Sequence, residues 1–102
     1  DIMGKVIFTI KYNILPEKRK DYLEVVRELK NVVKAEGLET YSVFEQKNKQ
    51  NSFEEIYVFV SKEAYENFDD NQDERVDLLM TKLSDMIKEQ STQYTTLVEV
   101  ES

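Results

Sequence analysis

Hydrophobic and polar residues alternate in four segments of the chain, which is the pattern of half-buried β-strands. These segments are KVIFTIKYNI (5–14), TYSVFEQK (40–47), FEEIYVFVS (53–61) and QYTTLVEV (93–100). In the first of them, alternation places Val6, Phe8, Ile10 and Tyr12 on one face and Ile7, Thr9 and Lys11 on the other. The short polar linker NKQNS between the second and third segments predicts an antiparallel hairpin.

Apolar residues recur at helical spacing in two longer segments. The first, 17–37, carries a stripe of Tyr22, Val25, Val26, Leu29, Val32 and Val33. Pro16 suits the first turn of this helix, and Gly37 is well placed to stop it. The second, 69–90, carries a stripe of Val76, Leu79, Met80, Leu83, Met86 and Ile87. Asn71, with Glu74 three residues later, is a start signal for this helix.

A short helix, KEAYENF (62–68), is predicted between the third strand and the last helix, with Ser61 as its N-cap. The predicted order is therefore β-α-β-β-α-β, the split βαβ arrangement of ferredoxin-like α+β folds. It implies one domain over residues 1–102, with an antiparallel four-stranded sheet and helices on one face. The other face, with Ile7 and Thr9, is half apolar, and two such faces packed together would form a dimeric α+β barrel.

Composition narrows the classes of function. The chain has 102 residues, of which 40% are hydrophobic, so a packed core is expected. The formal net charge of −7 argues against nucleic-acid binding and against attraction to anionic lipid. No apolar run is long enough to span a bilayer, and no signal peptide is expected. The absence of cysteine fits a reducing compartment, so a cytoplasmic location is expected.

The absence of histidine and cysteine excludes several kinds of site. No Ser-His-Asp or Cys-His arrangement is possible, nor is a zinc site built on those ligands. The only glycines, Gly4 and Gly37, are too far apart for a P-loop or a dinucleotide fingerprint. The acidic segment DDNQDE (69–74) has Glu74 and Met80 where a calcium loop needs Gly and Glu. We therefore expect no metal and no cofactor.

The aromatic residues are the best candidates for a binding site. Tyr12, Tyr57, Phe59, Tyr65 and Phe68 could line a cleft between the sheet and the helices. The competing interpretation is that they fill the core, with the tyrosine hydroxyls reaching solvent. A small apolar or aromatic ligand is expected if they line a cleft.

The chain resembles the antibiotic biosynthesis monooxygenase-like (ABM) domains over nearly its whole length. The resemblance rests on Pro16 and Gly37 at the helix ends, the strand YSVFE (41–45), and SKEAY (61–65) after an aromatic strand end. It implies a homodimeric α+β barrel with a cleft in each subunit between sheet and helices. Members of this group include cofactor-independent oxygenases acting on polyphenols or quinols, haem-degrading enzymes, and proteins without known activity.

Two departures from the family pattern bear on function. Phe68 stands where many members carry His, and Phe59 stands where many carry Trp. Haem degraders use an Asn on the first strand, a Trp after the third strand and a His on the last helix. Ile10 and Phe68 occupy the first two of these positions, and the chain has no His. Haem degradation of that kind is therefore not expected.

Three functional hypotheses remain open on the sequence. A cofactor-independent oxygenase needs only to bind and orient an electron-rich substrate and to help remove a proton, which a Tyr, a Lys or an ordered water could do. A dimer of the same fold could instead bind a small molecule or serve a structural role without chemistry. A third hypothesis is a partner-binding module that uses the acidic helical surface.

Overall fold

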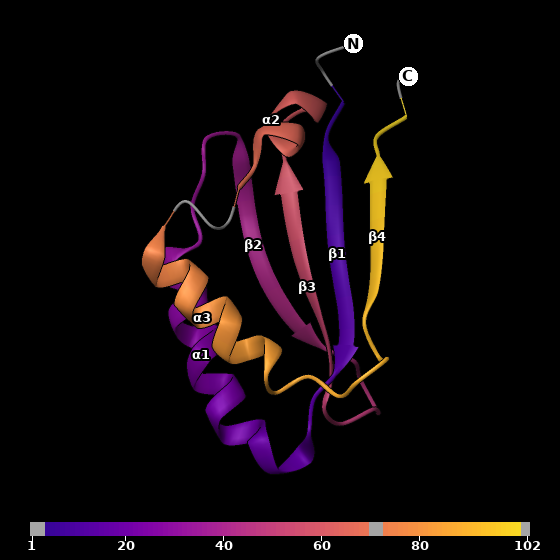
Figure 1. The fold of residues 1–102 in the computed structure, drawn as a ribbon. Helices are drawn as coiled ribbons and strands as arrows, with labels where there is room; N and C mark the ends of the chain where they lie inside the picture. The colour runs from indigo at the N-terminus through magenta and orange to yellow at the C-terminus, as the bar shows by residue number, and fades with distance from the viewer. Residues whose placement is uncertain (1–3, 70–72, 101–102) are drawn as a thin grey trace.

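A computed structural model describes residues 4–69 and 73–100 (Figure 1). Its strands are β1 (Val6–Asn13), β2 (Leu38–Glu45), β3 (Ser52–Phe59) and β4 (Gln93–Val98). They form one antiparallel sheet in the order β2-β3-β1-β4. The helices are α1 (Arg19–Val32), α2 (Lys62–Asn67) and α3 (Glu74–Ser84), with a 3₁₀ turn η1 (Pro16–Lys18) before α1. This is the predicted ferredoxin-like α+β fold, and each predicted strand is present within a few residues of its expected bounds.

The register of the sheet confirms the predicted division of β1 into two faces. Val6, Phe8 and Tyr12 lie opposite Phe59, Tyr57 and Phe53 of β3, respectively. These residues face the helices and belong to or pack against a single buried apolar cluster. The helices contribute the following buried residues to that cluster: Tyr22, Val25, Val26 and Leu29 from α1, and Val76, Leu79 and Leu83 from α3.

The first long helix is shorter than predicted. Pro16 occupies the first position of η1, as expected, but α1 ends at Val32 rather than at Gly37. Val33 already has an extended backbone conformation, so the loop 33–37 runs separately to β2. Gly37 is not the helix stop; it has a φ of 81° in the turn that leads into β2.

The last helix is also shorter than the predicted 69–90. Asp73 caps α3, because its carboxylate accepts hydrogen bonds from the backbone N–H groups of Arg75 and Val76. The proposed start signal Asn71 lies outside the described residues. Beyond Ser84 the chain turns back to the sheet, where Ile87 forms a β-bridge with Ile14. Backbone pairing with β1 therefore replaces the last helical turn that the apolar stripe predicts.

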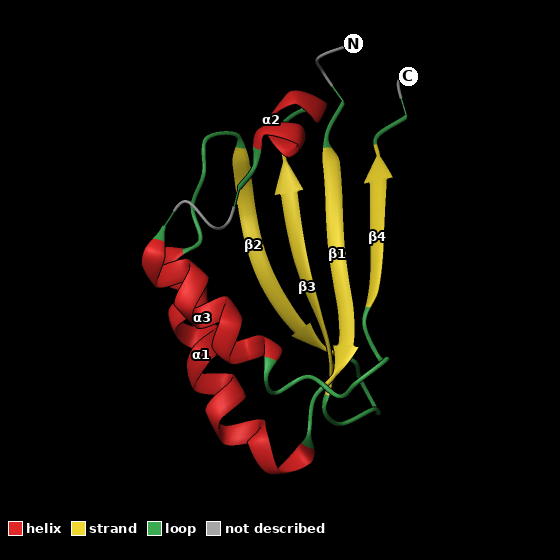
Figure 2. Ribbon diagram, viewed as in Figure 1, coloured by secondary structure: helices red, strands yellow, loops and turns green. Residues whose placement is uncertain are grey.

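The two long helices cover only part of the sheet. Figure 2 shows α1 and α3 together towards the β2 side, and α2 at the end of the sheet where β3 terminates. All six residues of β4 are exposed. Tyr94, Thr96 and Val98 of β4 lie on the helix side, because their partners Ile10, Phe8 and Val6 do. The helix side of the sheet is therefore open towards solvent next to β4.

The opposite face of the sheet has no helix over it among the described residues. It presents Ile7 and Thr9 of β1 with apolar residues of the other strands: Phe44, Ile56, Val58 and Leu97. Phe44 and Leu97 are 56% and 53% exposed, which is high for large apolar side chains. The predicted half-apolar bare face is confirmed, and its packing against a second copy stays a prediction.

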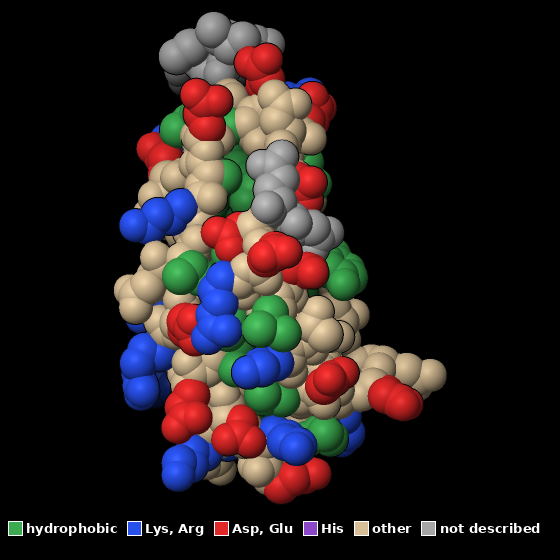
Figure 3. All heavy atoms as spheres, turned by 60° about the vertical axis from the view of Figure 1, so that its left-hand side comes forward, with side chains coloured by type: hydrophobic (Ala, Val, Ile, Leu, Met, Phe, Trp, Pro, Cys, Tyr) green, Lys and Arg blue, Asp and Glu red, His purple; other side chains and the backbone are tan. Residues whose placement is uncertain are grey.

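Charged side chains of both signs are spread over the surface of α1 and α3, whereas acidic ones predominate in the upper part of the view in Figure 3. Two ion pairs tie α1 to its neighbours. Arg19 binds Glu45 of β2 through two hydrogen bonds, and Arg75 of α3 binds Glu28 of α1. Within the described ranges, no helix is long and apolar enough to cross a membrane.

Candidate functional site

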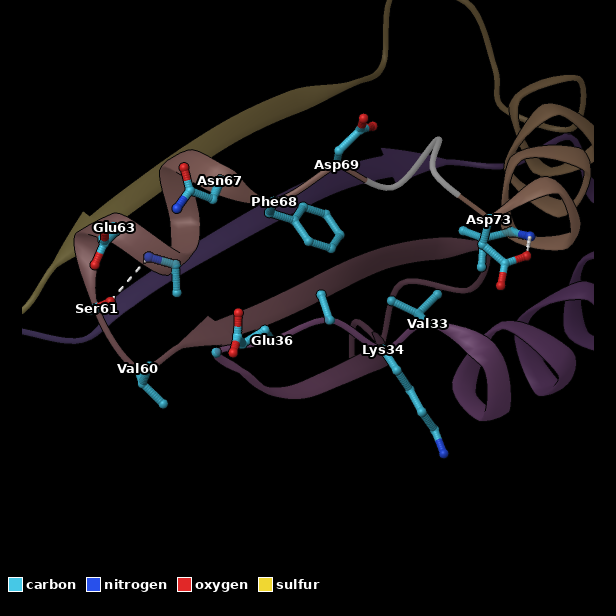
Figure 4. A pocket seen from close by; sticks show the side chains of 14 residues that line it. Val33, Lys34, Glu36, Val60, Ser61, Glu63, Asn67, Phe68, Asp69 and Asp73 are labelled. Carbon is cyan, nitrogen blue, oxygen red and sulfur yellow. Dashed lines mark hydrogen bonds between the residues drawn. The ribbon is translucent and has the colours of Figure 1, made fainter.

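A cavity of about 770 Å³ opens to solvent between the loop 33–37, α2 and the start of α3. Its volume lies within the range of roughly 300–1,000 Å³ that is usual for small-molecule sites. The apolar part of its lining consists of Val33, Ala35, Gly37, Val60, Ala64, Phe68 and Val76. Figure 4 shows the ring of Phe68 directed towards the space between α2 and the loop.

Local backbone chemistry fixes the walls of this cavity. The Ser61 hydroxyl accepts a hydrogen bond of 3.1 Å from the Ala64 N–H, so the predicted cap of α2 is confirmed. Gly37 accepts a hydrogen bond of 2.8 Å from the Val60 N–H, which joins the loop to the end of β3. A Cβ on Gly37 would lie 2.4 Å from the Ala64 Cβ, so only glycine allows the loop to approach α2 this closely.

Four of the five candidate residues come together behind this cavity. The Phe68 ring lies 5.5 Å from the Tyr57 ring and 5.3 Å from the Phe59 ring, measured between centroids. Tyr65 contacts Phe59 at 5.6 Å. Phe68 lines the cavity, whereas Tyr57 and Phe59 are each only 1% exposed. Phe68 therefore forms part of the cavity wall, whereas Tyr57 and Phe59 belong to the packed core.

This aromatic cluster continues towards β4. Phe8 contacts both Tyr57 and Tyr65, with centroid distances of 5.8 and 6.0 Å. The exposed ring of Tyr94 stacks on Phe8 at 6.1 Å, and the Tyr65 hydroxyl lies 3.3 Å from the Thr96 hydroxyl. Aromatic surface thus extends from the cavity wall to the uncovered strand.

Tyr12 lies apart from the other four candidates. It is buried below α1, where its hydroxyl shares a hydrogen bond of 2.7 Å with that of Tyr22. Burial raises the pKa of Tyr12 far above its usual value, and the nearby charge of Glu55 raises it further. Tyr12 is therefore a protonated core residue at neutral pH, and it does not line the cavity.

The sequence reasoning missed one chemically important residue, Glu55 of β3. It is only 2% exposed, and one of its carboxylate oxygens accepts a hydrogen bond of 2.8 Å from the Tyr41 hydroxyl. Burial, followed by the charge of Glu55, raises the pKa of Tyr41. The signal was present in the strand pattern, because Glu55 occupies an inward position between Phe53 and Tyr57.

Glu55 is separated from the cavity by aromatic rings. The Phe68 ring contacts Tyr57, the Tyr57 ring lies 4.8 Å from the Tyr41 ring, and Tyr41 donates to Glu55. Because burial keeps the hydroxyls of Tyr12, Tyr22 and Tyr41 protonated, these groups act as hydrogen-bond donors rather than bases. Glu55 accepts the hydrogen bond that Tyr41 donates within this buried cluster.

No cluster of three or more acidic side chains able to hold a metal ion occurs among the described residues. Asp69 and Asp73 of the acidic segment both line the cavity, and Asp73 is committed to capping α3. The three residues between them lie outside the described ranges.

Comparison with known proteins places the fold. No protein-family model matches the chain, and no curated protein matches it. A solved structure from Caulobacter crescentus, described as a "putative antibiotic biosynthesis monooxygenase", aligns with a TM-score of 0.78 and 16% identity over 98% of this chain and 93% of its own. A second structure with the same description, from Deinococcus radiodurans, aligns with a TM-score of 0.75 and 13% identity over 95% of this chain and 94% of its own.

A third solved structure, from Bacteroides thetaiotaomicron, is described as a protein of unknown function and possible oxidoreductase. It aligns with a TM-score of 0.74 and 12% identity over 94% of this chain and 98% of its own. These likenesses span nearly complete chains at low identity. They show that the chain has the ABM-like fold, in agreement with the resemblance drawn from the sequence.

Proposed function

We propose that this protein binds a small aromatic compound of phenol or quinol type and oxidises it with dioxygen, without a cofactor. The observation that carries the proposal is the cavity beside α2, whose wall includes Phe68 and continues into the Tyr57, Phe59 and Tyr65 cluster. The descriptions of the similar structures as monooxygenases or as an oxidoreductase support the same class of reaction.

The cavity wall supplies binding and orientation. A flat aromatic ligand would stack on or against Phe68, since aromatic pairs prefer offset or edge arrangements with centroids roughly 4.5–7 Å apart. The apolar side chains of Val33, Val60 and Val76 would exclude water from its faces. Holding the ligand in one orientation supplies part of the lowering of the barrier.

In the proposed reaction the substrate itself provides the electrons. Loss of a proton gives an electron-rich anion, which transfers electrons to dioxygen and forms a carbon–oxygen bond. One oxygen atom stays bound to that carbon, and the other leaves as water with two hydrogen atoms that the substrate loses. The first proton passes to water that the open cavity admits, because Glu55 is buried and does not line the cavity.

A homodimer through the bare sheet face is part of this proposal. The exposed apolar residues Phe44 and Leu97 support it, because monomeric proteins rarely leave such patches uncovered. Light scattering during gel filtration should give a mass of twice 12.1 kDa. Val58→Lys, on the bare face, should give a monomer, whereas Leu78→Lys, on the exposed side of α3, should leave the dimer intact. A monomeric wild-type protein at tens of micromolar would contradict this assembly.

A binding protein without catalysis is the second candidate. It is favoured by the burial of Tyr12, Tyr57 and Phe59, since each is only about 1% exposed and therefore packs as core. In this case the cavity would hold the same aromatic ligand without oxidising it.

Oxygen uptake with a panel of naphthalene-diols and anthrones tests the oxygenase, with product masses read in parallel. We expect uptake that is saturable and yields products one oxygen heavier and two hydrogens lighter. Phe68→Ala should raise KM, and Leu78→Ala, at an exposed position outside the cavity lining, should leave both kcat and KM unchanged. Saturable binding without uptake above the uncatalysed rate would favour the second candidate. Neither binding nor uptake would refute both.

A further inference from the structure

The cavity beside α2 combines an apolar wall with an acidic rim. Four carboxylates and one ammonium group contribute to its lining, from Glu36, Glu63, Asp69, Asp73 and Lys34. Acidic groups therefore outnumber basic ones by three at a site whose interior is formed by Phe68 and small aliphatic side chains.

The single basic residue does not offset the acids at this position. Figure 4 shows the Lys34 side chain extending away from the space in front of Phe68, and Glu36 on the loop that faces α2. Glu63 lines the same cavity farther from Phe68, beside Ser61 at the start of α2. Within the described part of the chain, neither Glu36 nor Glu63 has an ion-pair partner, and the described ion pairs lie elsewhere. Their negative charges are thus available to a ligand.

Some depressions on this protein have an acidic lining and others do not. The depression at the β2–β3 turn is lined by Arg19, Lys47 and Lys49, with Glu45 as its single acid. The depression beside the start of β2 is lined by Lys30 and Lys34 against Glu39. The depression between α1 and α3 is also acidic, with Asp21, Glu24 and Glu28 against Lys82. The cavity beside α2 is the larger of these two acidic sites.

An inorganic cation is a poor match for these groups. The described residues contain no cluster of three or more acidic side chains able to hold a metal ion. Phe68, Val60 and Val76 also offer no ligand oxygen atoms, and they favour an apolar body. The occupant must therefore combine an apolar part with a positive charge at one end.

We propose that the ligand of this cavity is a small aromatic compound bearing a protonated amine, with its ring against Phe68 and its ammonium group near Glu36 and Glu63. This inference rests on the proposed function and adds the charge of the substrate to it. The rim carboxylates attract the protonated amine and repel aromatic compounds that carry a carboxylate or phosphate. The same groups therefore favour cationic ligands and disfavour anionic ones.

Three probes that share one phenol ring test the charge preference: 4-(2-aminoethyl)phenol, 4-(2-hydroxyethyl)phenol and 4-hydroxyphenylacetate. Their binding to ¹⁵N-labelled protein is followed through the amide signals of residues 33–37 and 60–68. We expect the amine to bind roughly fivefold or more tightly than the alcohol, and the carboxylate to bind weakest. Raising the salt concentration from 0.02 to 0.5 M should shrink these differences.

A charge-matched pair of variants locates the effect. Glu36→Gln with Glu63→Gln should reduce the amine preference to about twofold or less, because each exposed carboxylate contributes a factor of about two to five. Glu24→Gln with Glu89→Gln, which makes the same change in net charge away from the cavity, should leave the preference intact.

The possible failures are distinguishable. Equal binding of the three probes at these amides, or an equal loss of preference in both double variants, would overturn the charge inference and leave the proposed function standing. If none of the three probes binds at these amides, the charge inference is overturned. If uncharged naphthalene-diols also fail to bind there, the proposed function is overturned as well.

Discussion

Replacing Tyr41 with Phe removes one hydroxyl group and nothing else from the buried cluster around Glu55. That hydroxyl donates a hydrogen bond of 2.8 Å to a carboxylate that is only 2% exposed. A hydrogen bond to a charged group contributes about 1.5–3 kcal/mol. The ring itself stays packed against Tyr57, so no cavity forms.

We therefore expect Tyr41→Phe to lower the free energy of unfolding by about 2 kcal/mol, a sizeable part of the roughly 5–15 kcal/mol typical of a small domain. For a chain of this size the melting temperature should fall by about 8–16 °C. Urea unfolding measures the loss, and an unchanged slope would show that the folded state remains compact.

Tyr94→Phe provides the matched control. Its side chain is 68% exposed, so removal of its hydroxyl should change stability by less than about 0.5 kcal/mol. A double-mutant cycle with Glu55→Gln should give a coupling energy of at least about 0.5 kcal/mol if the two side chains act together. Equal effects of Tyr41→Phe and Tyr94→Phe would refute the role given to this hydrogen bond.

Four further predictions follow from the described contacts. Gly37→Ala should destabilise the protein by about 1–2 kcal/mol or more, because of its positive φ and the close Ala64 Cβ, and Ala64→Gly in the same chain should recover only part of that loss in urea unfolding. Phe59→Ala should lower the free energy of unfolding by about 3–5 kcal/mol, since this ring is buried. Phe68→Ala should lower it clearly less, since Phe68 lines the cavity, and equal losses in thermal melts would contradict this assignment. Burial raises the pKa of Tyr12, Tyr22 and Tyr41, so the contribution of these three hydroxyls to stability should be constant below pH 10 and fall above it. At least these three of the six tyrosines should ionise only on unfolding, as read from tyrosinate absorbance; ionisation of all six in the folded protein near pH 10 would be inconsistent with their burial. Hydrogen bonding to Arg19 lowers the pKa of Glu45 to about 2. Glu45→Gln should therefore be less stable than the wild type by under about 1 kcal/mol above about pH 4.5, and this difference should vanish as the pH falls towards 2. A difference independent of pH would exclude this ion pair as its source.

The alternation and helical spacing of apolar residues predicted the elements and their order because both patterns reflect burial against one core. The ends of the helices were less predictable. Gly37 looked like a helix stop, but its conformation serves the close approach of the loop to Ala64, a contact between segments distant in sequence. Ile87 also matched the apolar stripe of the last helix, but in the structure it pairs with Ile14 in a β-bridge. An apolar residue at this position is compatible with either arrangement.

The candidate site was predictable only as a group of aromatic residues. Sequence spacing brought Tyr57, Phe59, Tyr65 and Phe68 to the same end of the sheet, but it could not separate the buried rings from the one that lines the cavity. Glu55 could have been found, because an acid at an inward strand position requires a buried partner. That Tyr41 is this partner depends on the register between β2 and β3, which the sequence pattern does not specify.

Titration of ¹⁵N-labelled protein with 1,4-dihydroxynaphthalene under anaerobic conditions tests the central claim most directly, because it reports where an aromatic ligand binds before any chemistry occurs. The account predicts saturable shifts at the amides of Gly37, Ala64 and Phe68, and loss of those shifts in Phe68→Ala but not in Leu78→Ala. Shifts confined to the bare face of the sheet, at Ile7, Ile56 and Val58, or no saturable shifts at all, would contradict a binding site in the cavity beside α2.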